Sequence, residues 1–373
     1  MRRVTFLDGL RGLAALQVVL GHYTSAFLPT INPRLGVLAD GQCAVFLFFL
    51  MSGFVLTPSF IHAKQGPGTI ILRRLVRLGL PALVACLFAA GILFWSPNLG
   101  RSAALAVHSD WLVSVTGGYP IQTFLSDLTG WSLVAGFSET SLFLKPIVSS
   151  QLGSTNPPTW TLHIELWGSL WVLILCTAWR HSRRIYQCLL LLSLPMLGAN
   201  PISLFTVGHL WSASSSALSS QRWLSPRQKL CVGLTSCAVG AVLCSFFSEP
   251  GYAPAWVTGL PYRFNWFDWH KELGALAIFL GVMSVPGLQH VLEGKLPRFF
   301  GSLSFPIYLT HWPIMIVIGS FTFEQAKSSG TPSAAMLALA VGLLVTIPVA
   351  LAFERTCDLP AIRLSKRLVF RAS

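Results

Sequence analysis

The sequence predicts an all-α, polytopic membrane helix bundle of about ten transmembrane helices, with both termini in the cytoplasm. Hydrophobic residues make up 53% of the 373-residue chain and charged residues only 10%, and the mean hydropathy is +0.64. Such a composition is typical of a chain dissolved in lipid rather than one packed around a water-soluble core. The expected segments lie near 6–28, 41–58, 75–95, 159–179, 186–200, 202–218, 230–248, 273–287, 303–322 and 335–353.

The distribution of positive charge predicts the orientation of these segments. With the N-terminus in the cytoplasm, 20 of the 26 Lys and Arg residues lie on the inner side, and every short inner loop is basic, as the positive-inside rule expects. The net charge of +13 then reflects topology and attraction to anionic lipid. No basic patch interleaved with aromatic residues is present, so nucleic acid is not an expected partner.

The chain is expected to form a single membrane-embedded domain over residues 1–373, with a short basic cytoplasmic tail at about 354–373. One long outer loop is expected at about 96–158, where it could cover or select an external substrate. A second outer loop, 249–272, is rich in aromatic residues. The eight cysteines form no CxxC pair and no metal-ligand spacing, so we predict small apolar residues and no metal site.

Arg11 and His22 in the first segment give the strongest indication of a functional site. Eleven helical residues make roughly three turns, so the two side chains share one face about 16 Å apart. Charged and titratable groups inside a membrane segment are costly, so function is the default hypothesis. The alternative is that Arg11 reaches the interface and His22 forms a hydrogen bond inside the bundle.

Two further groups lie near the inner half of the predicted bundle. Arg73, Arg74 and Arg77 stand at the inner mouth of the third segment, where a guanidinium cluster suits phosphate groups but also the inner leaflet itself. Ser52, followed by Gly53, lies in an apolar helix. A Ser-Gly pair there usually permits close helix packing, and no adjoining base activates Ser52 as a nucleophile.

Further polar groups lie in the fourth, sixth and ninth segments, and the group at the outer start of the fourth segment is expected nearer the outer face. Glu165 and His163 are two residues apart and point away from each other on a helix, but either could meet His22 from a neighbouring helix. A carboxylate beside the imidazole would fix its tautomer and raise its basicity. Tyr308 and His311 are three residues apart and share a face. His209 is expected to be a hydrogen-bonded packing residue.

These residues alone leave two functions open. A cationic inner mouth and an imidazole–carboxylate site near the outer face suit a membrane transferase whose anionic donor enters from the cytoplasm. They also suit a transporter or flippase for an anionic or acylated metabolite.

Several blocks, taken together and in order, resemble the acyltransferase 3 family of integral membrane acyltransferases. They span nearly the whole chain, and one departure is Trp167-Gly168, where an aromatic pair commonly follows the glutamate. The blocks are Phe6-Leu7-Asp8-Gly9-Leu10-Arg11-Gly12-Leu13-Ala14-Ala15 with His22, the Phe-Phe-x-x-Ser-Gly-Phe segment at 48–54, the Arg-Arg-x-x-Arg run at 73–77, Pro158-Thr159-Trp160-Thr161-Leu162 with Glu165, Gly301-Ser302-Leu303-Ser304-Phe305-Pro306-Ile307-Tyr308-Leu309-Thr310-His311-Trp312-Pro313, and Glu354 with Pro360.

The resemblance implies transfer of an acyl group, usually acetyl, from cytoplasmic acyl-CoA such as acetyl-CoA to a hydroxyl of an extracytoplasmic acceptor. Typical acceptors are carbohydrates or glycolipids, and the expected location is the bacterial inner membrane. His22 would be the catalytic base, with Arg11 near the thioester and Glu165 orienting His22 or the acceptor. Donor phosphates would bind Arg73, Arg74 and Arg77, with Arg11 contributing. The residues expected to contact substrate are Ser52, Trp160, His163, Tyr308 and His311.

Overall fold

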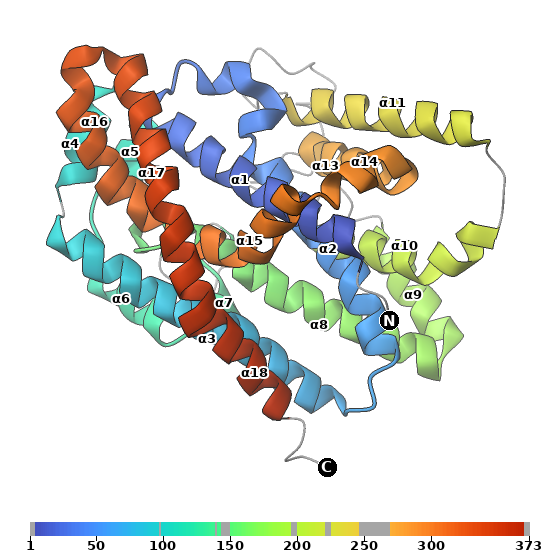
Figure 1. Cartoon of the computed structure of the whole chain (residues 1–373). Helices are drawn as coiled ribbons and strands as arrows, with labels where there is room; N and C mark the ends of the chain where they lie inside the picture. The colour runs from blue at the N-terminus through green and yellow to red at the C-terminus, as the bar shows by residue number, and fades with distance from the viewer. Residues whose placement is uncertain are drawn as a thin grey trace. The chain divides into compact units, whose positions relative to one another are not determined.

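The computed structural model describes residues 4–96, 98–138, 140–142, 150–194, 200–220, 225–245 and 269–368, with only the backbone of 215–220. Every regular element in these ranges is a helix, which confirms the predicted all-α class (Figure 1). The chain divides into two compact units. Unit 1 comprises Met1–Ala14, Gln42–Pro67 and Trp167–Ser302, and unit 2 comprises Ala15–Gly41, Gly68–Leu166 and Leu303–Ser373.

The helices of the described ranges have the following order along the chain. Those up to residue 160 are α1 (Thr5–Phe27), η1 (Asn32–Ala39), α2 (Gly41–Ile61), α3 (Pro67–Trp95), α4 (Leu99–Ala106), α5 (Asp110–Val115), α6 (Ile121–Leu128), α7 (Trp131–Ala135), η2 (Gln151–Gly153) and η3 (Pro157–Thr159). The later ones are α8 (Trp160–His181), α9 (Arg183–Ser193), α10 (Ile202–Ser220), α11 (Pro226–Ser245), α13 (Trp269–Ser284), α14 (Pro286–Leu292), α15 (Lys295–Ile314), η5 (Met315–Gly319), α16 (Ser320–Ala326), η6 (Lys327–Ser329), α17 (Thr331–Phe353), η7 (Glu354–Asp358) and α18 (Leu359–Arg367).

Six helical stretches in the described ranges are long and apolar enough to cross a membrane, or seven if the bent pair α13–α14 is one span. The predicted count of about ten is therefore not confirmed, and the orientation of the termini stays a prediction. The segments expected at 6–28, 186–200 and 202–218 form α1, α9 and α10, which are outside the six. The helix α9 has only 11 residues, whereas a span needs about 20.

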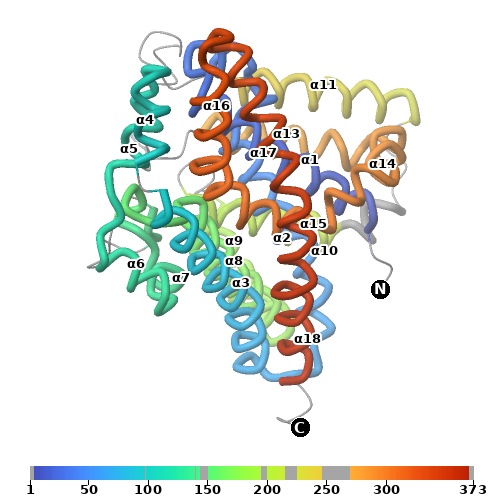
Figure 2. Tube along the Cα trace, turned by 60° about the vertical axis from the view of Figure 1, so that its left-hand side comes forward, coloured from blue at the N-terminus to red at the C-terminus, as the bar shows by residue number. Residues whose placement is uncertain are grey.

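The segment 96–158 is not the long open loop that we expected. It contains the four short helices α4 to α7, together with η2 and η3. Ser109 begins α5, because its hydroxyl accepts a hydrogen bond from the Leu112 backbone N–H at 3.2 Å, and glycines with positive φ, Gly130 and Gly136, stand on either side of α7. Short capped helices satisfy backbone groups that a long buried loop would leave unpaired. Helix α4 packs against both α5 and α16, and Figure 2 shows α4 and α5 in succession.

Close packing in unit 1 depends on small residues. Gly233 and Gly240 of α11 face Gly281 and Gly274 of α13, and a side chain at any of these positions would overlap the facing helix. The two helices therefore run side by side (Figure 1). Membrane helices commonly associate in this way, because small residues let backbones approach closely.

The Ser52-Gly53 pair serves the same purpose in α2. A Cβ on Gly53 would overlap the backbone of Phe205 in α10, and Ser52 is buried in the same helix. The predicted packing role of this pair is thus confirmed for Gly53.

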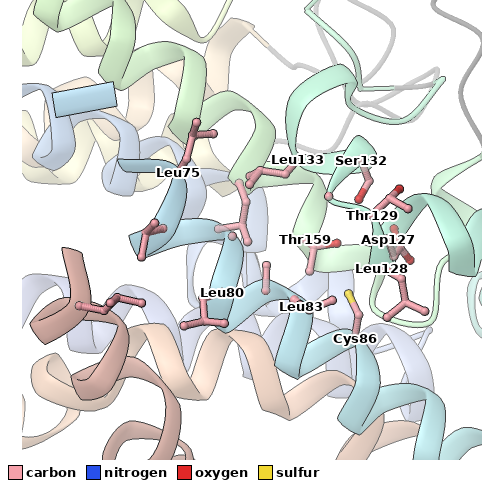
Figure 3. Close-up of a pocket in the computed structure, with 16 residues that line it drawn as sticks. Leu75, Leu80, Leu83, Cys86, Asp127, Leu128, Thr129, Ser132, Leu133 and Thr159 are labelled. Carbon is pink, nitrogen blue, oxygen red and sulfur yellow. The ribbon is translucent and has the colours of Figure 1, made fainter. Parts of the chain in front are cut away.

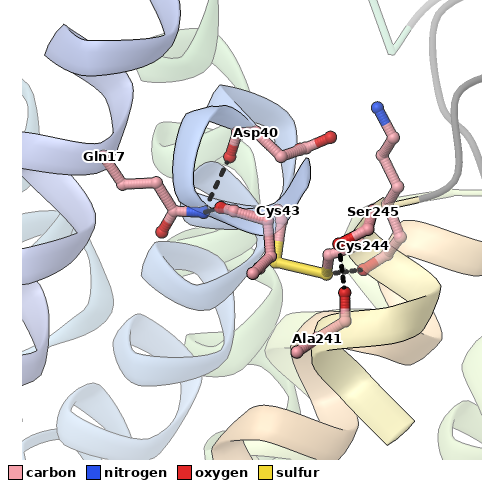
Figure 4. The surroundings of a disulfide bond; sticks show 8 residues. Gln17, Asp40, Cys43, Ala241, Cys244 and Ser245 are labelled. Atoms are coloured by element: carbon pink, nitrogen blue, oxygen red, sulfur yellow. Dashed lines mark hydrogen bonds between the residues drawn. A yellow bond between two sulfur atoms is a disulfide. The ribbon is translucent and has the colours of Figure 1, made fainter. Parts of the chain in front are cut away.

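Two cysteines contradict the prediction that all eight act as small apolar residues. Cys43, near the start of α2, and Cys244, near the end of α11, form a disulfide within unit 1 (Figure 4). The two positions are 201 residues apart in sequence, so spacing could not reveal the pair. The aromatic-rich loop expected at 249–272 lies almost entirely outside the described residues, which resume at Trp269.

Candidate active site

His22 and His311 form a hydrogen-bonded pair at the centre of unit 2. The distance between His22 Nδ1 and His311 Nε2 is 2.8 Å, and the two ring planes are parallel within 6°. His22 comes from α1 and is half-buried, whereas His311 comes from α15 and is fully buried. Helix α15 continues through Pro306 and Pro313 without a break, then passes into the π-helical turn η5.

The hydrogen bonds around this pair determine which nitrogen of His22 is basic. His311 Nδ1 lies 3.0 Å from the Ile307 carbonyl oxygen, which can only accept, so Nδ1 carries the proton and Nε2 is an acceptor. His22 Nδ1–H therefore donates to His311 Nε2. This assignment, made from the network, leaves the lone pair of His22 on Nε2, where a general base needs it.

Two tryptophans enclose the His22 ring. Trp111 of α5 stacks on it, with ring centroids 5.8 Å apart and an interplanar angle of 20°. Trp312 approaches it edge-on at 5.3 Å. These rings fix the orientation of the imidazole and reduce its exposure to water. Neither tryptophan was among the predicted site residues, although Trp312 directly follows His311 in sequence.

A second cluster joins α15 to the start of α8. The Tyr308 hydroxyl donates to the Pro158 carbonyl oxygen at 2.6 Å, and the Thr161 hydroxyl lies 2.8 Å from the same phenol oxygen. The Tyr308 ring lies 6.0 Å from the His311 ring. Tyr308 thus positions His311 and the α8 terminus relative to each other, so its expected substrate contact stays a prediction.

Asn156 is a further site residue that sequence reasoning missed. Its Nδ2 donates to the Leu309 carbonyl oxygen at 2.9 Å. That carbonyl would ordinarily accept from residue 313 in an α-helix, but Pro313 has no N–H. Asn156 is fully buried, and its Oδ1 has no partner among the described residues. The Asn-Pro-Pro sequence and a proline four residues after Leu309 were the available signals.

The role of the hydrogen bond between Asn156 and Leu309 can be tested with a second substitution that restores the lost stability. We expect Asn156→Ala to destabilise the protein by about 1–3 kcal/mol, since a buried carbonyl loses its only side-chain donor. The substitution Pro313→Ala restores a backbone N–H for Leu309, so the double variant should recover part of that loss. Thermal unfolding in detergent measures both. Pro313→Ala could instead lower the melting temperature by the same amount in the wild-type and Asn156→Ala proteins. In that case Asn156 does not stabilise the protein through the Leu309 carbonyl.

Glu165 has a different partner from the one we expected. Its Oε1 accepts from Arg74 Nη2 at 2.8 Å, and the two side chains are only 17% and 11% exposed. Glu165 therefore pairs with a guanidinium of α3, and His311 takes the place beside His22 that we expected for Glu165. The physical reason is charge, because a buried carboxylate is stabilised far more by a fixed cation than by a neutral imidazole.

The other two arginines of the α3 cluster have different surroundings. Arg77 lies close enough to Asp358, in the π-helical turn η7, to attract it electrostatically. Arg73 is half-buried and has no acidic partner in the part of the chain that the structure describes. All three arginines lie within α3, which begins at Pro67 rather than at residue 75. Arg73 is thus the arginine best placed to bind an added anion.

His163 is held by backbone groups. Its Nε2 accepts from the Leu142 N–H at 3.1 Å, and its Nδ1 donates to the Leu133 carbonyl oxygen at 3.2 Å. These two bonds tie His163 to α7 and to the segment that follows it, and its expected substrate contact stays a prediction.

Three predicted residues remain outside this cluster. Arg11 and His22 share the continuous helix α1, as predicted, with Arg11 in the part that belongs to unit 1. Ser52 lies in unit 1, and Trp160 begins α8 in unit 2. Their expected substrate contacts stay predictions.

His209 has the packing role that we predicted. Its Nδ1 lies 2.9 Å from the Thr57 hydroxyl, and its Nε2 lies 3.0 Å from the Tyr186 hydroxyl. All three residues belong to unit 1.

The polar residues of unit 2 form a line from an imidazole to a group of arginines. His22 bonds to His311, whose ring neighbours Tyr308, and Tyr308 bonds to Thr161. Thr161 stands one helical turn before Glu165, which binds Arg74. The arrangement can accept a proton at one end and bind an anion at the other. No group of three or more His, Cys, Asp or Glu residues suited to a metal occurs in the described ranges.

Comparison with known proteins decides between the two functions left open by the sequence. Residues 4–355 match the family model described as an acyltransferase domain. A protein of Komagataeibacter xylinus named as a membrane-bound transacylase, BcsY, is 25% identical over 91% of this chain and 80% of its own length. The acyltransferase clz18 of Cochliobolus lunatus is 23% identical over 91% of this chain and 88% of its own length.

The match to a further relative covers a smaller part of both chains. A protein of Staphylococcus aureus named as an O-acetyltransferase is 27% identical over 45% of this chain and 28% of its own length. No solved structure matches the chain. The family model covers the His22 helix, the α3 arginines and the His311 helix together, so the chain belongs to the acyltransferase 3 family and is an integral membrane O-acyltransferase.

Proposed function

We propose that the protein moves an acyl group, acetyl in the simplest case, from cytoplasmic acyl-CoA to a hydroxyl of an extracytoplasmic acceptor. The observation that carries this proposal is the His22–His311 pair, which leaves His22 Nε2 as a base. A carbohydrate or glycolipid is the acceptor class that the family resemblance suggests. The proposed location is the bacterial inner membrane, where both substrates are within reach.

In the proposed reaction, His22 Nε2 takes the proton of the acceptor hydroxyl while that oxygen attacks the thioester carbonyl carbon. The carbon–sulfur bond then breaks, the acyl group stays on the acceptor oxygen, and the CoA sulfur takes the proton from His22. His311 acts as a positioning residue, because its bond to Nδ1 keeps the lone pair on Nε2 and stabilises the imidazolium that forms.

The arginines of α3 are the proposed binding site for the CoA phosphates. Guanidinium groups bind phosphate oxygens with strong, charge-assisted hydrogen bonds. Arg74 is already paired with Glu165, so we assign the main contact to Arg73, with Arg77 and Arg11 contributing. Glu165 then holds Arg74 in place and does not itself act on the acceptor.

The disulfide supports the proposed orientation independently of the arginines. The positive-inside pattern predicts that the start of α2 and the end of α11 lie on the outer side, and these ends carry Cys43 and Cys244. Disulfides persist in oxidising compartments outside the cytoplasm. Arg180 agrees with the same orientation, because its Nη2 donates to the Phe60 and Ala63 carbonyl oxygens at the opposite end of α2.

Donor binding tests this proposal without knowledge of the acceptor. Acetyl-CoA at about 100 times its Kd should stabilise the detergent-solubilised protein by about 2.7 kcal/mol, seen as a rise in melting temperature. Arg73→Ala should weaken binding roughly 10- to 100-fold, since a charged hydrogen bond contributes about 1.5–3 kcal/mol. If Arg73 binds the 3′-phosphate, Arg73→Ala should weaken the binding of 3′-dephospho-CoA less than it weakens the binding of acetyl-CoA.

Arg184→Ala is the matched control, since Arg184 is an exposed arginine of α9 in unit 1. It should leave the acetyl-CoA shift unchanged. Folded protein that shows no saturable shift with acetyl-CoA or longer acyl-CoAs would contradict the proposed donor. An equal loss in Arg73→Ala and Arg184→Ala would contradict the proposed site.

A further inference from the structure

A cavity in unit 2 lies apart from the His22–His311 pair and has no role in the proposed reaction. Its volume is about 400 Å³, within the usual range for small-molecule sites. One wall is the apolar face of α3, with Leu75, Leu80 and Leu83 (Figure 3). The helix lies in a candidate membrane span, most of whose apolar window is not buried inside the protein, so this wall is suited to contact with lipid.

The opposite end of the cavity is polar. Asp127 of α6 lies there with Thr129 and Ser132, on the other side from the leucines (Figure 3). Asp127 is 4% exposed. Its Oδ2 accepts from the Ser154 hydroxyl at 2.7 Å, whereas its Oδ1 is buried and has no partner among the described residues.

An unpaired carboxylate oxygen in such a place is costly. Burial raises the pKa of Asp127 to about 6, because the surroundings offer its charge too little solvation. Hydrogen bonds from Ser154, Ser132 and the Thr155 backbone limit that shift, and Oδ1 is the carboxylate oxygen left without a partner in the described ranges. A buried anionic oxygen with no donor is destabilising, and a bound hydrogen-bond donor would remove the penalty.

We propose that this cavity binds a hydroxyl-bearing amphiphile, with the hydroxyl donating to Asp127 Oδ1 and the aliphatic chain lying along the leucines of α3. A carboxylate accepts and cannot donate, so the ligand must bring the donor. The apolar wall extends from Leu75 to Leu83, so it suits a ligand with an aliphatic chain rather than a compact polar molecule. This proposal does not depend on the donor or on the role of His22.

The test compares two lipids of equal chain length, 1-monooleoylglycerol, which has two free hydroxyls, and methyl oleate, which has none. Protein in lauryldimethylamine oxide is suitable, because that detergent head carries no hydroxyl to compete. We expect monooleoylglycerol to raise the melting temperature at roughly 10- to 100-fold lower concentration than methyl oleate, the range for a hydrogen bond to a charged group.

Two variants locate the site. Gly79 lines the cavity, so Gly79→Leu should fill it and abolish the monooleoylglycerol shift. Gly91 lies on the same helix with no atom near its Cβ position, so Gly91→Leu is the matched control and should keep the shift. Both changes replace glycine in a helix, which favours the helix itself. Asp127→Leu should remove the preference for monooleoylglycerol over methyl oleate.

Each outcome decides the proposal. A wild-type protein that binds both lipids equally has no donor contact at Asp127, and the proposal fails. It also fails if Gly79→Leu keeps the full shift, since the lipid then binds elsewhere. A cooperative thermal transition without added lipid serves as the folding control in every variant, and acetyl-CoA binding is measured separately, so a failed lipid site and a failed donor site can be told apart.

Discussion

Replacing His22 with alanine is expected to lower kcat for acyl transfer by about 10²- to 10⁴-fold, the range that a positioned general base contributes. The structure gives the reason: Nδ1 is committed to His311, so Nε2 is the atom left to take a proton. Acetyl-CoA binding should change little, because the proposed phosphate site lies in α3. Transfer to an identified hydroxyl acceptor, followed with radiolabelled acetyl-CoA, measures the effect.

His209 supplies the matched control for this prediction. It is a fully buried histidine in unit 1 that bonds to Thr57 and Tyr186. His209→Ala should lower the melting temperature but leave kcat per folded molecule near the wild-type value. Transfer at the wild-type rate in folded His22→Ala protein would rule out His22 as the base.

His311 distinguishes positioning from direct catalysis. We assign His311 to holding the tautomer of His22, so its effect should depend on His22 being present. His311→Ala should therefore lower kcat in the wild-type background and have little further effect in His22→Ala. Such non-additivity is the mark of residues that act as a unit. Independent, additive losses would contradict the positioning role.

Breaking the Arg74–Glu165 pair is expected to cost about 3–5 kcal/mol of stability, because each charge loses this counter-charge in a mostly buried place. Arg74→Ala and Glu165→Ala should each lower the melting temperature strongly. The double variant should lose less than the two single losses combined, since neither charge then remains. Thermal unfolding in detergent gives all three values.

The Lys327–Glu324 pair offers a comparison within the same unit. Its N–O distance is 2.6 Å, but the lysine side chain is 56% exposed and the two residues are three apart on the surface. Water screens such pairs, so Lys327→Ala should cost no more than about 0.5 kcal/mol. If Glu165→Ala were as mild as Lys327→Ala, the buried pair would not be holding α8 against α3.

The fold class and the identity of several site residues could be predicted from the sequence. Apolar segments of bundle length predicted an all-α chain, whereas the predicted count of about ten spans stays unconfirmed, with six candidates or seven in the described residues. The position of Arg11 and His22 on one helix followed from residue spacing alone, since helical periodicity is a local property. The family resemblance likewise rested on blocks read directly from the chain.

The pairing of those residues could not be predicted. His22 lies 289 residues from His311, Arg74 lies 91 from Glu165, and Cys43 lies 201 from Cys244. Each polar group had several chemically acceptable partners, and periodicity within one helix does not say which neighbouring helix it will face. Asn156 shows the same limit, because its partner is a carbonyl that a distant proline leaves without a donor.

The sequence by itself thus determined that the chain is all-α, which residues are costly to bury, and which family the blocks resemble. The tertiary structure alone decided that His311, and not Glu165, orients His22, and that Glu165 instead neutralises Arg74. The physical reason is that secondary structure follows from local periodicity and hydrophobicity, whereas the partner of a buried charge depends on which helices pack together. Pairing of this kind lowers the cost of burying polar and charged groups.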